Sequence, residues 1–156
     1  MDKIDFEFCD FKNPKHTTAL VDLLNHYMSD PMGDYPQHDK KKQLLLIDGL
    51  SKHSSAFVLF IKFNGEYAGL TTCFVNFSTF KLKPYLYVHD VVIHQKFRGK
   101  RLGRLIMEQL VHISRERDYC KITLEVREDN VAAKSLYKSL GFEECEPKMY
   151  FWTKTL

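Results

Sequence analysis

The feature that most constrains the fold of this chain is a succession of four segments: a strand, a basic loop, an amphipathic helix and a second strand. The first strand is Leu86 to Ile93 (LYVHDVVI), which is almost wholly apolar and β-branched, as is typical of a central strand covered on both faces. Apolar residues from Leu102 to Ile113 then fall on one helical stripe, and Lys121 to Val126 alternates as a strand. Because a helical crossover joins parallel strands, this succession predicts a parallel pair within an α/β fold.

The rest of the chain predicts a mixed sheet with helices on both faces, in the order β-α-α-β-β-β-α-β-α-β-β. Asn64-Gly65 between two β-rich runs indicates a hairpin. Asn130 suits a helix N-cap, and Gly141 suits the left-handed position after the end of that helix. The other expected strands are Ile4 to Phe8, Ala56 to Phe63, Tyr67 to Phe77, Phe142 to Cys145 and Tyr150 to Lys154, and the other expected helices are 15 to 27, Asp39 to Lys52 and the helix that ends at Leu140.

Composition narrows the class of protein. With 156 residues, 44% of them hydrophobic, and no linker or repeat, we expect a single domain over residues 1–156. The chain has no apolar run long enough for a membrane span and no signal peptide at its N-terminus, so we expect a soluble, cytoplasmic protein, either a monomer or a homodimer. A net charge of +3 is too mild to indicate nucleic-acid binding. The four cysteines lie far apart, which predicts neither disulfides nor a metal site.

The loop after the apolar strand has the composition of an anion site. It reads Phe97-Arg-Gly-Lys-Arg-Leu-Gly-Arg104 and leads into the amphipathic helix. Glycines let a ligand approach the backbone, and the free amides and the dipole of a helix N-terminus favour a negative group such as a pyrophosphate. A solvated basic turn has the same composition, so both interpretations stand at this point.

A second group of residues runs from Asn130 to Phe142. Ala133, Leu136, Tyr137 and Leu140 share one helical face, which is typical of a core-facing stripe and makes Tyr137 a candidate core aromatic. Its hydroxyl nevertheless requires a hydrogen-bond partner, which leaves a chemical role open.

Together these two segments resemble the GNAT superfamily of N-acetyltransferases. That family carries a Q/R-x-x-G-x-G/A loop after its fourth strand and an N-x-x-A-x-x-x-Y-x-x-x-G-F segment downstream, and the second pattern is complete here. In the loop, Arg98 and Gly103 match, but Arg101 replaces the middle glycine. We expect position 101 to keep a negative φ, so that arginine is tolerated there.

The resemblance implies a fold, a co-substrate and a set of binding residues. It implies that the fourth and fifth strands splay apart, that acetyl-CoA lies between them, and that no metal takes part. Asn130 is then expected to contact the coenzyme arm, and Tyr137 to lie near its sulfur and protonate the departing thiolate. The remaining expected coenzyme contacts are the strand residues Val91, Val92 and Ile93 and the loop residues Arg98, Gly99, Lys100, Arg101, Leu102, Gly103 and Arg104.

The reaction also needs a base for the attacking amine. The segment before Val91 looks like that of the small-amine and polyamine acetyltransferases, with His89-Asp90 where those proteins have Glu-Asp. Neighbours in a regular strand face opposite sides, so only one of the two lines the site unless the strand is bulged. We rank His89 and Asp90 as catalytic candidates above Glu125. Glu125 could equally serve as a structural partner.

The expected partner is a small-molecule primary amine, with no nucleic acid and no membrane. By resemblance, its pocket is expected to involve Tyr27 to Tyr35 and Phe77 to Phe80. Two alternatives remain open: acetylation of a protein N-terminus or lysine, and a catalytically inactive CoA-binding regulatory domain.

Overall fold

The computed structural model describes residues 1–156, which form two compact units. The larger unit, Met1–Glu125, contains the sheet and three α-helices, and the C-terminal unit, Val126–Leu156, is described separately below. In chain order the larger unit comprises β1 (Ile4–Phe8), α1 (Pro14–Ser29), α2 (Lys40–Lys52), β2 (Ala56–Phe63), β3 (Glu66–Ser78), β4 (Lys83–Ile93), the 3₁₀ helix η1 (Gln95–Phe97), α3 (Leu102–Glu116) and β5 (Ile122–Leu124).

The five strands form one mixed sheet in the order β1-β2-β3-β4-β5. The first four pair antiparallel, whereas β4 and β5 pair in parallel, as the strand-loop-helix-strand pattern predicts. Asn64 and Gly65 both have positive φ between β2 and β3, the conformation of a two-residue hairpin turn. The predicted mixed α/β fold is confirmed.

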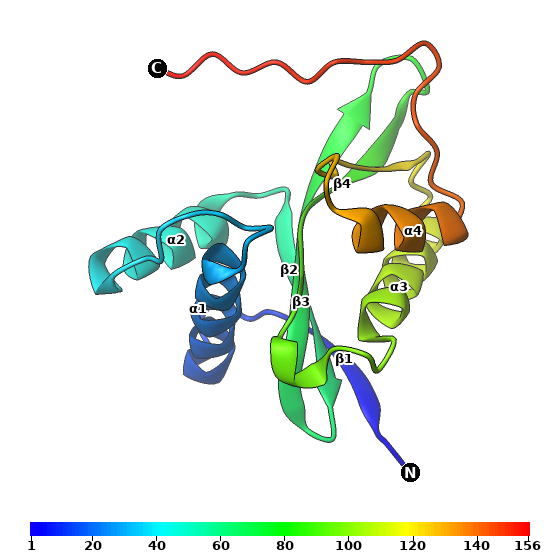
Figure 1. Ribbon diagram of the computed structural model, residues 1–156. Coiled ribbons are helices and arrows are strands. Elements are labelled where there is room, and N and C mark those ends of the chain that lie inside the picture. The colour runs from blue at the N-terminus through cyan, green and yellow to red at the C-terminus, as the bar shows by residue number, and fades with distance from the viewer. The chain divides into compact units, whose positions relative to one another are not determined.

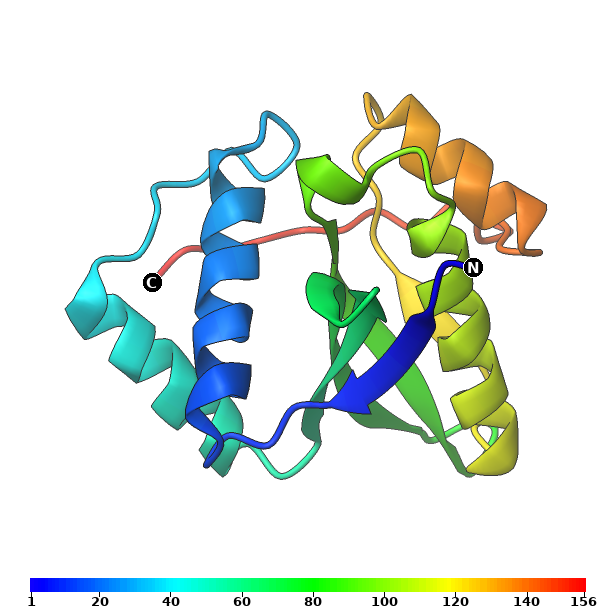
Figure 2. The same cartoon turned by 90° about the horizontal axis from the view of Figure 1, so that it is seen from below.

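Helices cover both faces of this sheet, with α1 and α2 on one side and α3 on the other (Figures 1 and 2). The period of two in β2 explains how both faces are filled: Val58 and Phe60 join a cluster with Leu20 and Leu24 of α1, and Leu59 and Ile61, which alternate with them, are also fully buried. On α3, the expected stripe is buried at Leu102, Ile106, Met107, Leu110 and Ile113.

The parallel pairing between β4 and β5 is short. It joins Leu86 to Ile122, Tyr87 to Thr123 and Val88 to Leu124, and then stops, while β4 continues to Ile93 against β3 on its other side. Backbone groups alternate between the two edges of a strand, so beyond Val88 those that face away from β3 have no strand partner. A gap between the two strands was expected at this point from the resemblance.

The C-terminal unit contains one helix, α4 (Val131–Ser139), with both ends capped as expected. The side chain of Asn130 accepts a hydrogen bond from the Ala133 amide at 3.1 Å. Gly141 has a φ of +87°, and the amides of Gly141 and Phe142 donate to the carbonyls of Lys138 and Tyr137, which is a Schellman closure.

The two strands expected after α4 are not formed. Phe142 to Cys145 and Tyr150 to Lys154 have no regular secondary structure, and Tyr150 and Trp152 are 81% and 86% exposed. Strands were expected here to complete the fold, but a strand also needs a neighbour that supplies hydrogen bonds, and no strand pairs with either segment.

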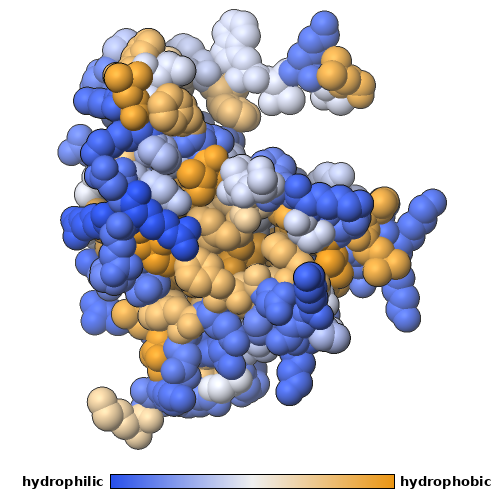
Figure 3. All heavy atoms as spheres, turned by 180° about the vertical axis from the view of Figure 1, so that it is seen from behind, coloured by the Kyte–Doolittle hydropathy of each residue, from blue (hydrophilic) through white to orange (hydrophobic).

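The surface is mixed in character. Seen from behind, hydrophobic residues gather in the middle of the face, and hydrophilic ones project around them (Figure 3). None of the helices combines the length and the apolar character that crossing a membrane requires.

Candidate active site

A bulge in β4 brings His89 and Asp90 to the same cavity. Thr72 of β3 pairs with Asp90 and Cys73 pairs with Val88, so His89 has no partner across the ladder. An extra residue in one strand interrupts the strict alternation of its side chains. Both His89 and Asp90 therefore line one wall, together with Thr72 and Phe74 of β3. The structure thus answers the question that the sequence left open for this pair.

The cavity has a volume of about 510 Å³ and lies in the larger unit, between the strands and the helical layer. Its other walls come from α1, the loop after α1 and α2. Gly33 is required in that loop, because a Cβ there would lie 1.9 Å from the Tyr27 carbonyl oxygen. The lining residues on this side are Leu24, Tyr27 and Met28, then Gly33, Tyr35 and His38, and finally Leu46 and Leu50.

Two polar atoms of the lining are buried without a hydrogen bond. They are Thr72 Oγ1 and His38 Nδ1. The Thr72 hydroxyl lies near enough to Asp90 to favour its ionised form, but not in hydrogen-bond geometry. Burial is the larger effect and raises the pKa of Asp90, while the nearby His89 opposes that shift. Since buried polar atoms are normally paired, these atoms indicate a wall built to meet a polar ligand.

Tyr87 connects two of the three base candidates. Its hydroxyl donates to Glu125 Oε1 at 2.7 Å and lies 3.3 Å from His89 Nδ1. Burial, together with the bond to Glu125, raises the pKa of Tyr87 to about 12, so the hydroxyl keeps its single proton at neutral pH. That proton is directed at Glu125, and Nδ1 of His89 must therefore be the donor to the tyrosine oxygen. Nε2 of His89 is left with a lone pair that can accept a proton.

The loop between η1 and α3 presents unpaired amides. Gly99 has a φ of +78° and nothing within 4 Å of the position of a Cβ, so the backbone is open there. The first hydrogen bond within α3 is from the Leu105 amide to the Arg101 carbonyl, and no side chain caps the helix. The amides from Gly99 to Gly103 have no acceptor in the protein, which is the arrangement that binds anions at helix N-termini.

Arg101 differs from the expectation. Its φ is +60° and its ψ is +15°, so it lies in the left-handed region, and the predicted negative φ is wrong. Gly99 and Arg101 both have positive φ in the short connection between η1 and α3, and Arg101 is the residue directly before Leu102. The left-handed conformation could not be predicted from the sequence, because arginine rarely adopts it. It costs about 1 kcal/mol or more.

Arg101→Gly is accordingly expected to stabilise the fold relative to Arg101→Ala. Both variants remove the guanidinium, but only glycine relieves the left-handed strain. The difference in free energy of unfolding should be about 1 kcal/mol, after the greater freedom of glycine in the unfolded chain is subtracted. Urea denaturation of both variants measures it, and equal stabilities would show that Arg101 is unstrained. Acetyl-CoA affinity should change by no more than about 1 kcal/mol in either variant.

Arg98 is engaged within the protein. Its amide donates to the Gln95 carbonyl, and its guanidinium donates to Asp30 Oδ2 at 2.7 Å. The hydrogen bond from Arg98 is the first cause that holds the pKa of Asp30 below its usual value, followed by one from the Met32 amide. A second link between α1 and the loop is the stack of His26 on His94, with ring centroids 4.0 Å apart. The loop is thus fastened to the helical layer.

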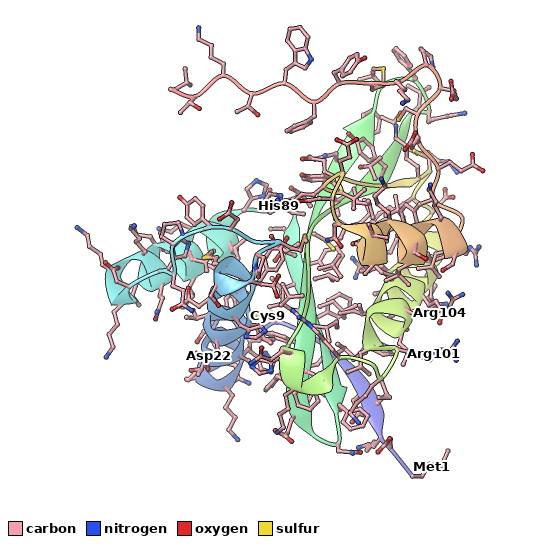
Figure 4. The ribbon with its side chains drawn as sticks, viewed as in Figure 1. Met1, Cys9, Asp22, His89, Arg101 and Arg104 are labelled. Atoms are coloured by element: carbon pink, nitrogen blue, oxygen red, sulfur yellow. The ribbon has the colours of Figure 1, made fainter.

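The other cations of the loop differ in their contacts. Lys100 Nζ lies 4.7 Å from the centre of the Phe63 ring, and Arg104 pairs with Glu108 at 2.9 Å. Arg101 has no acidic partner. Arg101 and Arg104 lie at the same end of α3, with their side chains directed away from the sheet (Figure 4). This end of the helix therefore offers positive charge beside the open amides.

The remaining candidates are distributed over both units. Val91, Val92 and Ile93 follow His89 and Asp90 on β4, where the pairing with β5 has ended. Asn130 and Tyr137 belong to the C-terminal unit: Asn130 caps α4, and Tyr137 is 9% exposed, with its ring 5.8 Å from that of Phe142.

The residues that line the cavity differ in part from those expected from the sequence. Tyr27, Met28 and Tyr35 line it as expected, but Phe77 and Phe80 are 60% and 97% exposed and do not. Asp30, which lies within the expected range Tyr27 to Tyr35, does not line the cavity and is bound to Arg98. The missed residues are Leu24, His38, Leu46, Leu50, Thr72 and Phe74. They carry no motif, and only the packing of α2 against the sheet brings them together.

The sequence is similar to those of known acetyltransferases. The sequence model of the Acetyltransferase (GNAT) family matches residues 19–142. An uncharacterized N-acetyltransferase of Methanocaldococcus jannaschii is 26% identical over 81% of this chain and 58% of its own length. The [ribosomal protein bS18]-alanine N-acetyltransferase of Escherichia coli is 32% identical over 42% of this chain and 45% of its own.

Similarity to solved structures extends over nearly the whole chain. A crystal structure of an aminoglycoside acetyltransferase from an uncultured soil metagenomic sample, in complex with sisomicin, has a TM-score of 0.79 at 15% identity and covers 98% of this chain and 96% of its own. At that identity the likeness shows the fold alone. The chain spans 27% and 58% of the length of the first curated relatives that it matches.

Proposed function

Because the chain belongs to the acetyltransferase (GNAT) family, we propose that it transfers the acetyl group of acetyl-CoA to the primary amine of a small molecule. The observation that carries the proposal is the cavity of about 510 Å³ with His89 and Asp90 in one wall. Cavities of this size suit small ligands. Acetyl-CoA supplies the activated acyl group as a thioester, and the protein supplies binding, orientation and proton transfer.

The donor side is supported by the loop and by the free edge of β4. The open amides from Gly99 to Gly103, with the positive end of α3 behind them, fit a pyrophosphate. The unpaired backbone groups of β4 after Val88 fit the amide-bearing pantetheine arm. In this proposal Val91, Val92 and Ile93 hold the arm, and a backbone amide of β4 stabilises the oxyanion that forms on attack.

The acceptor side is supported by the His89 arrangement. An amine attacks only when it is neutral, and it must lose a proton as the new amide bond forms. In the proposal His89 Nε2 accepts that proton, directly or through water, while Tyr87 and Glu125 hold the ring in the required tautomer. Asp90 accepts a second hydrogen bond from the amine. Glu125 thereby becomes a positioning residue and not the base.

The direct test is an acetyl-transfer screen. Purified protein is incubated with acetyl-CoA and single amines, and free coenzyme A thiol is measured along with the mass of each product. We expect acetylation of at least one small amine, with thiol release that depends on the amine. Transfer to a peptide N-terminus or a lysine peptide alone would favour the protein-acetylating alternative. Binding of acetyl-CoA without transfer to any acceptor would favour a regulatory domain.

Tyr87→Phe is expected to slow the reaction without affecting acetyl-CoA binding. The variant removes the hydroxyl that fixes the tautomer of His89 but keeps the ring that stacks on Phe74. The fall in kcat/KM should be smaller than the roughly 100-fold or more that a general base contributes, because the base remains. The acid limb of the pH profile should also move. A structural defect would lower the rate equally at every pH.

The matched control is Tyr85→Phe, which makes the same change two residues earlier on β4. The ring of Tyr85 lies under Lys121 Nζ at 4.8 Å, and its hydroxyl has no hydrogen bond. This variant should keep the wild-type pH profile. An unchanged profile in Tyr87→Phe as well would remove the positioning role.

A further inference from the structure

The acceptor cavity is apolar on most of its surface. Its apolar lining comes from Leu46 and Leu50 of α2, Phe74 of β3, and Leu24 and Met28 of α1. Such a wall stabilises the complex by covering the hydrocarbon part of a ligand. It has no polar or charged group that could pair with a charge on the ligand. The part of the ligand that lies against it must therefore be apolar.

The cavity holds a single carboxylate, that of Asp90. Among the acidic residues in the loop after α1, Asp30 is paired with Arg98 at 2.7 Å, and Asp34 is exposed to solvent and does not line the cavity. A polyamine or an aminoglycoside carries several ammonium groups at neutral pH, and each one that leaves water needs its own acidic partner. One carboxylate can pair with one ammonium or amino group. The single negative charge in this cavity therefore matches a monoamine.

The two buried polar atoms without hydrogen bonds add a second requirement. Thr72 is 2% exposed and its Oγ1 is unpaired, as is Nδ1 of His38. A ligand with one hydroxyl or similar group gives either atom a partner, whereas a pure hydrocarbon leaves both unpaired. Thr72 lies beside Asp90, so the cavity fits an amine at these two residues and a hydrogen-bonding group at His38, and apolar side chains line most of the rest.

We propose that the acceptor is a primary monoamine with an apolar body and one hydrogen-bonding group, and not a polyamine or an aminoglycoside. This inference rests on the proposed function, since it names the substrate class of the same site. It departs both from the polyamine branch that the His89-Asp90 segment resembles and from the acceptor class named for the structural neighbour with sisomicin.

The test compares kcat/KM for tyramine, phenethylamine, spermidine and kanamycin under one set of conditions. We expect tyramine and phenethylamine to exceed spermidine and kanamycin by at least about tenfold, the scale on which an apolar pocket discriminates between ligands. Tyramine should be the better monoamine, because its hydroxyl gives the pocket a hydrogen bond. Equal or faster acetylation of spermidine or kanamycin would overturn the inference while the proposed function stands. Thiol release with none of the amines tested, despite acetyl-CoA binding, would overturn both.

A second experiment places a negative charge in the apolar wall of the cavity. Leu46→Asp should lower kcat/KM for phenethylamine by roughly tenfold and raise the preference for spermidine. No residue of α2 is fully buried, so the fold should survive. The matched control is Leu45→Asp on the same helix, where the side chain is 62% exposed and does not line the cavity. It should leave both rates unchanged. An unchanged amine preference in Leu46→Asp would place the acceptor elsewhere and overturn the inference.

Discussion

Gly103→Glu should abolish acetyl-CoA binding while the protein stays folded. Gly103 is the second residue of α3, and its amide is among those without an acceptor in the protein. The new carboxylate would occupy the positive end of the helix where the pyrophosphate is proposed to bind, and would repel it. Loss of charge-assisted hydrogen bonds on this scale corresponds to at least roughly 100-fold in Kd, or about 2.7 kcal/mol. Isothermal titration calorimetry measures the change.

The same change should not damage the fold. A glutamate in the first turn interacts favourably with the helix dipole, so Tm should stay level or rise slightly. Gly49→Glu is the matched control, because Gly49 lies in α2 and has nothing within 4 Å of the position of its Cβ. That variant should bind acetyl-CoA normally. Wild-type affinity in folded Gly103→Glu would show that the coenzyme binds elsewhere.

Tyr137→Phe should reduce turnover by roughly 100-fold to 10,000-fold, the contribution of a general acid, with acetyl-CoA affinity close to normal. The prediction follows from the role that the family resemblance implies for Tyr137, which is to protonate the departing thiolate. Phenylalanine keeps the ring, which is buried and packs on Phe142, so α4 should retain its structure. Rapid-quench measurement of the acetyl-transfer step over a pH series separates chemistry from binding.

Tyr150→Phe is the control for this variant. It makes the same change in the same C-terminal unit, at a side chain that is 81% exposed, and should leave turnover unchanged. Full turnover of Tyr137→Phe, measured where acetyl transfer limits the rate, would show that Tyr137 is a core aromatic only. A large fall in Tm would show instead that its hydroxyl is a structural hydrogen-bonding group.

Much of the fold was readable from local patterns. The hairpin at Asn64-Gly65, the caps of α4 at Asn130 and Gly141, and the stripe on α3 each depend on residues close together in the sequence. Such signals are set by backbone sterics and by the period of the helix or strand. The resemblance to the acetyltransferase family rested on two local motifs, in the loop after β4 and in the segment from Asn130 to Phe142, and the family comparison confirms it. That the chain forms a single domain stays a prediction, since it divides into two compact units.

The strands expected after α4 show the limit of such patterns. Tyr150 to Lys154 is rich in the aromatic residues that favour strands, yet it has no partner strand, whereas β1 pairs with β2. A strand is stabilised by hydrogen bonds to a neighbour and by burial of one face, and neither is encoded within the segment itself.

The sequence by itself determined the order of the elements in the larger unit, the family, and the residue types that a transferase site requires. The tertiary structure decided which of these residues meet. A bulge at His89 places both His89 and Asp90 in the wall of one cavity. Tyr87 links His89 to Glu125 by hydrogen bonds, and Arg98 forms an ion pair with Asp30. These contacts link residues far apart in the chain, or depend on a register shift of one residue, and local periodicity specifies neither.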